Sequence, residues 1–393
     1  MNRRHFIAAA GVGIASLSAQ AIAADKKLRV AVIGNTSRGG YGHGLDTVWL
    51  KLPETEIVAV SDADAAGLAA AQKKLSAKQA FADYHEMVKT VKPDIVAVCP
   101  RFVDEHCEMT LAAIEAGAKG IYIEKPFCRT PSEADQIIAA AKKNGAKIAV
   151  AHRNRYHPTL QAIDRLIADG GLGKVLELRG RGKSDARGGG EDLWVLGSHV
   201  LNLINYFGGA PKTCSALVKQ NGERVTKAHV IEGKEGIGPL AGNAVHARYD
   251  MERGFVAYFD SIADDGTRGA GFGLQIIGSQ GIIDIKCDAQ PLAKLLRGNP
   301  FLPNKEPRSW VTISSAGPDV AEPIANLAEL IGQHVAPTRD LIASMNSDRE
   351  PLCGARDAAM TVEMIAAVFE SHRQGSAAVM LPLSDRGNPL ARL

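Results

Sequence analysis

The chain has 393 residues, more than the roughly 100 to 200 of a usual single domain, which predicts two domains with separate cores. Its 46% hydrophobic and 23% charged residues are ordinary for a globular protein and exclude a disordered chain. The net charge of +3 includes Arg3 and Arg4 of the N-terminal segment, so the remainder is nearly neutral; this excludes an electrostatic nucleic-acid or membrane-surface binder and favours a small-molecule partner.

The first 24 residues have the pattern of a twin-arginine signal peptide. Arg3-Arg4 and Phe6 are followed by a weakly apolar Ala/Gly/Ser run that ends in alternating alanines. Such a leader is recognised by the export machinery as a targeting signal and is then cleaved off. Residues 1–24 therefore predict recognition by the twin-arginine export machinery, a periplasmic or other extracytoplasmic location reached in the folded state, and no membrane attachment afterwards.

Residues 25–151 predict a doubly wound α/β domain. Val/Ile/Ala-rich runs at 28–34, 56–62, 94–100, 120–126 and 147–152 alternate with helical patterns. Continuous apolar runs are typical of parallel strands covered on both faces. We expect the intervening helices at 44–51, 65–75, 104–117 and 130–145, the last with Thr130 as N-cap and Pro131 at its first position.

Residues 152–393 have a different pattern, which predicts an α+β domain. A helix is expected at 159–173, and strands of alternating polarity at 174–182, 243–251, 254–262 and 273–286, before helical periodicity at 322–374. Alternation indicates one buried and one solvated face, so the sheet is expected to be open and largely antiparallel.

The six cysteines are scattered, without a C-x-x-C pair or a Cys/His cluster. Zinc sites and disulfide frameworks depend on such spacings. We therefore expect free thiols and no metal site.

The segment VAVIGNTSRGGYGHG, residues 30–44, follows the first strand and contains a variant dinucleotide-binding loop. Gly34 and Gly39 have the spacing of the outer glycines in G-x-G-x-x-G, whereas Thr36 replaces the middle one. Loop amides and an added guanidinium can still bind a pyrophosphate near a helix N-terminus. The predicted contacts are Gly34, Asn35, Thr36, Ser37, Arg38 and Gly39.

Asp62 ends the second strand, at the position where a carboxylate accepts hydrogen bonds from the ribose hydroxyls of an adenosine. A 2′-phosphate would meet a like charge there. Asp62 therefore predicts NAD in preference to NADP.

The fourth strand ends in Glu124-Lys125-Pro126, and DIVAVCP, AIEAGAKGIYIEKPF, NRYHP and GLQIIGSQGIIDIK occur in order around it. Together these segments resemble the glucose-fructose oxidoreductase/inositol dehydrogenase/MocA family, from Leu28 to the terminal helix. The resemblance implies a Rossmann domain joined to an open-sheet domain that binds a sugar or polyol. It also implies that Pro100, Glu124 and Lys125 contact the cofactor, that Lys125 lies between nicotinamide and substrate, and that the protein is a homo-oligomer.

The family's second catalytic element is a helix that reads Asp-x-Gly-x-His-x-x-Asp. This chain keeps Gly197 and His199 but has Val195 and Asn202 where acids are usual. His199 is the expected general base. Whether the nearby Asp192 replaces the acid missing at Val195 stays open. The expected substrate-binding residues are Lys125, Asn154, Arg155, Tyr156, Asp192, His199 and Asn202.

These features predict an exported NAD-dependent oxidoreductase that acts on a sugar, polyol or glycoside with a tightly bound cofactor. One alternative is an NAD-dependent glycoside hydrolase that uses transient oxidation and elimination. Another is a non-catalytic sugar-binding or scaffold protein on the same fold, which Thr36, Val195 and Asn202 favour.

Overall fold

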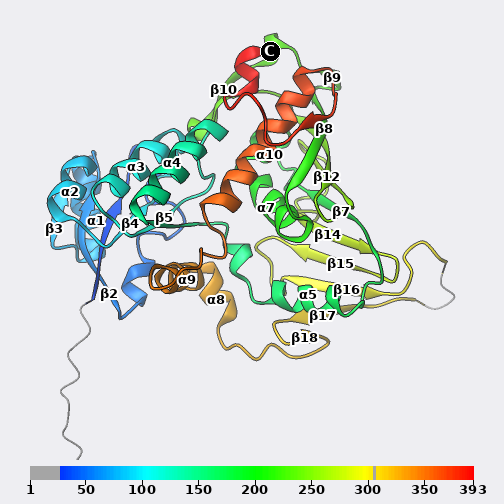
Figure 1. The fold of residues 1–393 in the computed structure, drawn as a ribbon, viewed down its shortest axis with the longest axis horizontal. Helices are drawn as coiled ribbons and strands as arrows, with labels where there is room; N and C mark the ends of the chain where they lie inside the picture. The colour runs from blue at the N-terminus through cyan, green and yellow to red at the C-terminus, as the bar shows by residue number, and fades with distance from the viewer. Residues whose placement is uncertain (1–26, 304–306) are drawn as a thin grey trace, which may run out of the picture.

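The computed structural model describes residues 27–303 and 307–393, and the predicted leader at 1–24 lies outside them. Within these residues, every helix is too short or too polar to cross a membrane. Two sheets dominate the fold, one in each half of the chain (Figure 1).

The first sheet has six parallel strands in the order β3-β2-β1-β4-β5-β6, as predicted for a Rossmann domain. Every residue of β4 and β5 is buried, because helices cover both faces. The strands are β1 (Leu28–Ile33), β2 (Thr55–Ser61), β3 (Gln79–Phe81), β4 (Ile95–Val98), β5 (Gly120–Ile123) and β6 (Lys147–Val150).

Four helices connect these strands: α1 (Ala65–Leu75), α2 (Tyr84–Val91), α3 (His106–Glu115) and α4 (Pro131–Asn144). The caps predicted for α4 are confirmed, since the Thr130 side chain accepts from the Glu133 amide and Gly145 ends the helix at φ 64°. Helix α9 (Val335–Met345), from the other end of the chain, packs with Val335 and Leu341 against the same core as Tyr122.

The helix predicted at 44–51 is wrong. Turns fill the segment after β1, and only a 3-10 helix, η1 (Val48–Lys51), follows them. The physical reason is backbone conformation, because the glycines at 39, 40, 42 and 44 have φ values of 88°, 68°, 64° and 99°. The turn after Gly34 therefore presents loop backbone where we expected a helix N-terminus.

The second sheet follows the order β18-β17-β16-β15-β14-β7-β13-β12-β8-β19, with β9 paired to β8. All its pairs are antiparallel except β7 with β13, which confirms a largely antiparallel sheet. Its main strands are β7 (Val175–Arg181), β8 (Pro211–Gln220), β12 (Ala244–Met251), β13 (Val256–Ile262), β14 (Gly273–Gly278), β15 (Gly281–Lys286), β16 (Ala293–Arg297) and β17 (Trp310–Ser314); the short ones are β9 (Glu223–Arg224), β18 (Gly317–Pro318) and β19 (Val379–Met380).

Helices α7 (Gly197–Gly208) and α10 (Ala355–Arg373) cover one face of this sheet (Figure 1). The remaining segments include α5 (Thr159–Ala168), α6 (Gly190–Val195), α8 (Leu327–Gly332) and a separate hairpin of β10 (Ile231–Gly233) with β11 (Gly238–Leu240). The other short 3-10 turns are η2 (Val103–Glu105), η3 (Arg153–Tyr156), η4 (Lys227–His229), η5 (Lys234–Gly236) and η6 (Pro389–Arg392).

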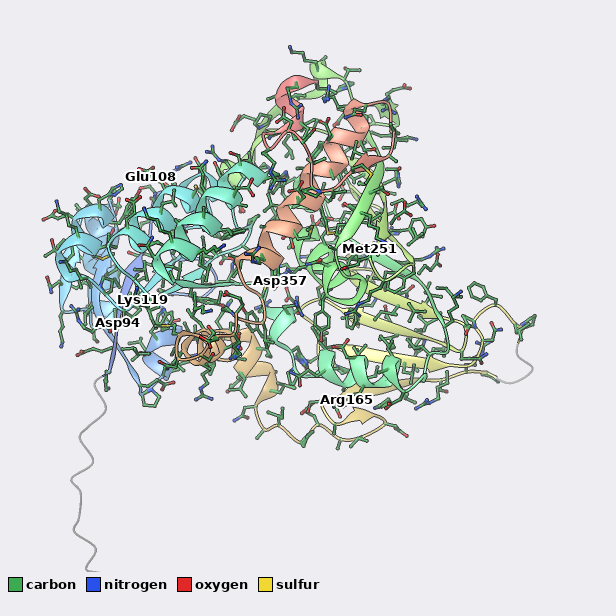
Figure 2. All side chains as sticks on the ribbon, in the orientation of Figure 1. Asp94, Glu108, Lys119, Arg165, Met251 and Asp357 are labelled. Carbon is green, nitrogen blue, oxygen red and sulfur yellow. The ribbon has the colours of Figure 1, made fainter. Side chains whose placement is uncertain are left out.

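The two halves meet where α10 begins. Ala149, on the edge strand β6, forms a bridge with Gly354, and Arg155 lies 3.6 Å from Asp357. Figure 2 shows Asp357 between the two halves, whereas Asp94, Glu108 and Lys119 lie in the Rossmann half. The carboxyl end of β6 therefore lies beside the second half.

Candidate active site

A small pocket of about 110 Å³ lies between the two halves. Its lining combines residues that follow β1, β5 and β6 with residues at the start of α7 and residues that follow β15 and α8. The lining consists of His43, Glu124, Lys125, Ala151, Arg153, Leu196, His199, Asp288 and His334. The structure thus brings the two predicted catalytic residues, Lys125 and His199, together.

Lys125 is the second residue after β5 and is 8% exposed. Its Nζ donates to the main-chain oxygen of Val195 at 3.0 Å, and its amide donates to Glu124 Oε1 at 2.9 Å. The position where the family usually has an acid therefore contacts Lys125 through a carbonyl that any side chain would leave in place.

His199 lies in the first turn of α7 and is 6% exposed. Gly197 makes this placement possible, since a Cβ there would come within 2.6 Å of the Phe259 ring. His199 Nδ1 has no hydrogen-bond partner in the described part of the chain. Burial, followed by the charge of Lys125, lowers the pKa of His199 to about 3. The imidazole is therefore neutral near pH 7 and can accept a proton.

Asp288, which the sequence analysis missed, supplies a carboxylate to the pocket from beyond β15. Arg153 Nε donates to it at 2.9 Å and Asn154 Nδ2 at 3.2 Å, while its own amide donates to Asn154 Oδ1 at 3.1 Å. Burial raises the pKa of Asp288, but the Arg153 hydrogen bond and neighbouring positive charge outweigh it and hold the pKa at about 2. Asp288 therefore stays ionised.

Two further histidines, also missed, complete the pocket. His43 Nδ1 lies 2.8 Å from Glu124 Oε2. Burial raises the pKa of Glu124, yet the contacts with His43 and Lys125 hold it well below its usual range. His334 Nδ1 lies 2.6 Å from the Tyr122 hydroxyl. Isolated histidines far apart in sequence offered no spacing signal from which this cluster could have been predicted.

At the end of β2, Asp62 is 1% exposed and already accepts hydrogen bonds from the glycine-rich loop. Thr36 Oγ1 donates at 2.6 Å, the Thr36 amide at 3.0 Å and the Tyr41 hydroxyl at 2.9 Å. The Tyr41 ring sits so close to Gly34 that a Cβ there would be 2.1 Å away. Two hydroxyls of the chain thus hold the positions in which ribose hydroxyls would bind Asp62.

Arg38, which we predicted to contact the phosphates, instead points toward acidic side chains in the segment after β4. Its guanidinium pairs with Asp104 and Glu105, both at 2.9 Å, and lies 4.6 Å from the centroid of the Phe102 ring. Asn35 Nδ2 also donates to Glu105 at 2.9 Å. Phosphate contacts by these two side chains stay a prediction, and they require these pairs to open.

The loop crosses the carboxyl ends of the central strands. A Cβ on Gly39 would lie 2.9 Å from the Arg101 Cβ, and one on Gly42 would lie 2.7 Å from Glu124 Oε2. Ser37 is exposed on the loop. The Pro100 carbonyl, beneath it, accepts from the ring of His106 at 2.7 Å.

Several predicted substrate-binding residues lie outside the pocket. The Arg155 guanidinium lies 3.8 Å from the centroid of the Tyr206 ring, and the Tyr156 hydroxyl donates to the Cys353 carbonyl at 3.2 Å. Asn202 Nδ2 donates to Thr361 Oγ1 at 3.2 Å. These side chains support packing between helices, and their contact with a substrate stays a prediction.

Asp192 is fully buried on α6. Its Oδ2 accepts from Ser261 Oγ at 2.5 Å and from the Ser184 amide at 3.0 Å. Asp192 therefore faces the sheet, whereas the carboxylates that share a pocket with His199 are those of Glu124 and Asp288.

All six cysteines, which lie in the described residues, are free thiols. Among the same residues, no group of three or more His, Cys, Asp or Glu side chains is arranged to hold a metal ion.

The residues fit a nicotinamide dinucleotide in their chemistry. Asp62 is a buried acceptor of two hydroxyls, and the buried His199 Nδ1 is unsatisfied within the described residues beside the Lys125 ammonium. The pocket volume of about 110 Å³ is below the roughly 300 Å³ of small ligand sites. This pocket alone is therefore too small to contain a whole dinucleotide together with a sugar.

Comparisons with known proteins agree with this geometry. Residues 28–152 match the model of the oxidoreductase family with an NAD-binding Rossmann fold, and residues 150–381 match the model of that family's C-terminal alpha/beta domain. The chain belongs to the glucose-fructose oxidoreductase/inositol dehydrogenase/MocA family. The predicted family is confirmed, and so is the Rossmann fold joined to an open sheet.

Members of this family resemble the chain only in part. D-glucoside 3-dehydrogenase of Escherichia coli K12 is 30% identical over 199 residues, 47% of this chain and 55% of that enzyme. D-apiose dehydrogenase of Paraburkholderia graminis is 27% identical, over 50% of this chain and 54% of that enzyme. The chain thus spans about half the length of these relatives.

Among solved structures of the same fold is levoglucosan dehydrogenase in complex with NADH and levoglucosan. It has a TM-score of 0.70 at 18% identity, with 91% of this chain and 99% of that one covered. At this identity the likeness concerns the fold alone.

Proposed function

We propose that the protein is an NAD(H)-dependent oxidoreductase that moves a hydride between a hydroxyl-bearing carbon of a carbohydrate and the nicotinamide. The observation that carries this proposal is the pairing of the Lys125 ammonium with a buried, neutral His199 in one pocket at the carboxyl end of the parallel sheet. Relatives named as dehydrogenases of D-glucosides and D-apiose support the carbohydrate class.

NAD supplies the hydride acceptor when bound, and Gly34, Asp62 and the amides of residues 35–39 are the groups that would hold it. Asp62 favours NAD over NADP, because a 2′-phosphate would be repelled by the carboxylate. The hydroxyls of Thr36 and Tyr41 must leave Asp62 as the ribose hydroxyls arrive. This exchange replaces hydroxyl donors by hydroxyl donors, so its net cost is small.

Lys125 is positioned to hold the substrate oxygen, since an ammonium stabilises the negative charge that develops on an alkoxide. His199 takes the hydroxyl proton on its neutral imidazole as the carbon–hydrogen bond breaks and the alcohol becomes a ketone. Asp288, held by Arg153 and Asn154, is placed to accept a hydrogen bond from a neighbouring sugar hydroxyl.

Two experiments test this proposal: detection of bound nucleotide, and then measurement of a single turnover. Purified protein should release a nicotinamide dinucleotide on denaturation or bind added NADH. A panel of sugars and glycosides should then reduce one equivalent of NAD. Release of aglycone without net reduction would instead identify the redox hydrolase, and failure to bind nucleotide would leave the non-catalytic scaffold.

We also propose export by the twin-arginine route, supported by Arg3-Arg4 and the apolar run that follows. The protein should fractionate with the periplasm. Replacement of both arginines by lysine should retain it in the cytoplasm, and unchanged export of that variant would contradict the proposal. The exposed face of the second sheet supports a homo-oligomer, which size-exclusion chromatography with light scattering tests.

A further inference from the structure

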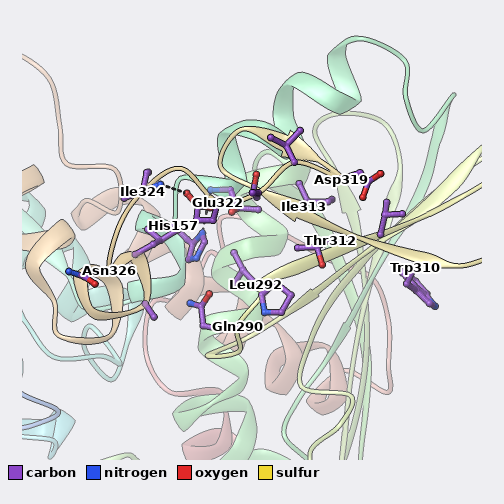
Figure 3. Close-up of a pocket in the computed structure, with 18 residues that line it drawn as sticks. His157, Gln290, Leu292, Trp310, Thr312, Ile313, Asp319, Glu322, Ile324 and Asn326 are labelled. Atoms are coloured by element: carbon purple, nitrogen blue, oxygen red, sulfur yellow. Dashed lines mark hydrogen bonds between the residues drawn. The ribbon is translucent and has the colours of Figure 1, made fainter.

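A second cavity, of about 720 Å³, lies at the β17 edge of the second sheet. Trp310 stands at one end of it and Asn326 at the other, with His157 and Gln290 between them (Figure 3). Its volume lies within the range of about 300 to 1,000 Å³ typical of small-molecule sites. It is several times larger than the pocket that contains Lys125.

Three chain segments connect this cavity with the catalytic pocket. The turn that supplies Arg153 to the pocket reaches His157 in the cavity, and Gln290 in the cavity lies two residues after Asp288 of the pocket. Asn326 lies at the start of α8, which leads on to His334 of the pocket. The two cavities share no lining residue among those described, but these three segments run from one cavity to the other.

The cavity lining combines an aromatic surface with hydrogen-bonding groups. Trp310 lines the cavity from β17 and is 42% exposed, so its ring is accessible. Thr312, Asp319 and Asn326 add donors and acceptors. An aromatic face beside such groups suits a sugar ring, which has apolar C–H faces and a rim of hydroxyls.

His157 contributes a buried donor, being 3% exposed. Its Nδ1 accepts from the Thr159 amide at 3.3 Å, so the proton of the neutral ring is on Nε2. No partner for Nε2 exists in residues 27–303 and 307–393. Burial lowers the pKa of His157 to about 4, which keeps the ring neutral near pH 7.

The charge of the cavity narrows the ligand class. Among the described residues, its lining includes Asp319 and Glu322 but neither lysine nor arginine. Phosphorylated sugars, nucleotide sugars and uronates would meet like charge here. A neutral ligand rich in hydroxyls is favoured.

From these observations we propose that the cavity between β17 and α8 is a subsite for a second, neutral sugar ring, so that the substrate is a disaccharide or a longer glycoside. This proposal rests on the proposed carbohydrate oxidoreductase function. The ring to be oxidised lies beside Lys125 and His199, and the next ring stacks on Trp310.

Isothermal titration of the NADH-loaded mature protein tests the subsite. The probes are methyl glucosides and methyl galactosides against maltose, cellobiose and lactose, with UDP-glucose as the charged probe. At least one disaccharide should bind about tenfold tighter than its methyl glycoside, a gain typical of one aromatic contact, and UDP-glucose should gain nothing.

Trp310→Ala should abolish that advantage and leave the methyl glycoside affinity unchanged. Asp319→Asn, which tolerates the left-handed backbone at φ 58°, should reduce it. Phe301→Ala, at another exposed aromatic residue, is the control and should change neither affinity.

Equal affinity for one-ring and two-ring probes, or an advantage that survives both substitutions, would overturn the subsite and leave the proposed function standing. Preferential binding of UDP-glucose would overturn it as well. If NADH binds but no sugar of either length does, the carbohydrate substrate class fails together with the subsite.

Discussion

The two ends of the candidate cofactor cleft differ in how their polar groups are satisfied. At the β2 end, the buried Asp62 carboxylate receives hydrogen bonds from Thr36 and Tyr41 of the loop that crosses it. At the β5 end, His199 Nδ1 and His334 Nε2 are buried without partners in the described residues. A protein leaves few such groups unpaired, because each costs about 1 to 3 kcal/mol. The polar groups at the β2 end are thus hydrogen-bonded within the protein, while the β5 end keeps unpaired polar groups that are available for chemistry.

This difference predicts that substitutions at the β5 end change catalysis and leave NADH affinity alone, whereas substitutions at the β2 end do the opposite. His199→Asn should have the largest effect. Loss of a general base should lower the single-turnover rate of NAD reduction about 100- to 10,000-fold. NADH affinity, measured by fluorescence titration, should change less than twofold. A rate within tenfold of the parent would exclude His199 as the base.

Lys125→Met should lower the same rate about 100- to 1,000-fold, as removal of one charge-stabilising donor does in other enzymes. Lys119→Met is the matched control, because Lys119 precedes the same strand but contacts only the Asn144 carbonyl at the surface. If both variants retain the parent rate, the alkoxide role of Lys125 is wrong.

Asp288→Asn should raise the KM for sugar about 10- to 100-fold, since a hydrogen bond to a charged group contributes about 1.5 to 3 kcal/mol. Asn tolerates the φ of 59° at this position. Asp284→Asn on the preceding strand controls for loss of charge. If the Kd for NADH increases and the KM for sugar does not, Asp288 binds the cofactor and its proposed role in sugar binding is wrong.

Tyr41→Phe tests the β2 end. It removes a hydroxyl that competes for Asp62, so NADH should bind about 3- to 10-fold tighter, in line with a net hydrogen-bond contribution of about 0.5 to 1.5 kcal/mol. Tyr84→Phe, on α2 of the same domain, should have no effect. Weaker NADH binding by the Tyr41 variant would show that the hydroxyl supports the cofactor rather than competing with it.

The last prediction concerns the dependence of stability on pH. Because the pKa of His199 is lowered from 6.5 to about 3 in the folded protein, the unfolded chain binds the extra proton between these values. Stability from His199 is therefore complete above about pH 6.5 and is lost as pH falls toward 3. The Tm of His199→Gln should fall less between pH 7 and 4.5 than that of the parent or of His85→Gln. An equal fall of Tm with pH in His199→Gln and in the parent would contradict the lowered pKa of His199.

Elements with strong local signals could be predicted from the sequence. Helix α4 has its N-cap, N1 proline and C-terminal glycine at the predicted positions. Strand β8 was missed because its buried positions are the small Cys214, Ala216 and Val218, which make the alternation weak. The helix after β1 was wrongly predicted because glycine in a left-handed conformation cannot be told from glycine in a helix by spacing.

For the candidate site, too, the residues in sequence motifs could be predicted and the others could not. Lys125 and His199 belong to motifs and were identified as candidates, and the structure brings them together. Asp288 carries no motif, and it joins the pocket only because Arg153 and Asn154, more than a hundred residues earlier, hold it there. Such long-range pairing is a property of the tertiary fold rather than of local spacing.

The contact of Lys125 with a main-chain oxygen has a consequence for how the protein can evolve. An interaction made by a carbonyl is independent of the codon at residue 195, so that position can drift from acid to valine while the lysine keeps its anchor. The Val195 side chain can meanwhile pack in the hydrophobic core, where a carboxylate would be costly to bury, without changing the orientation of Lys125.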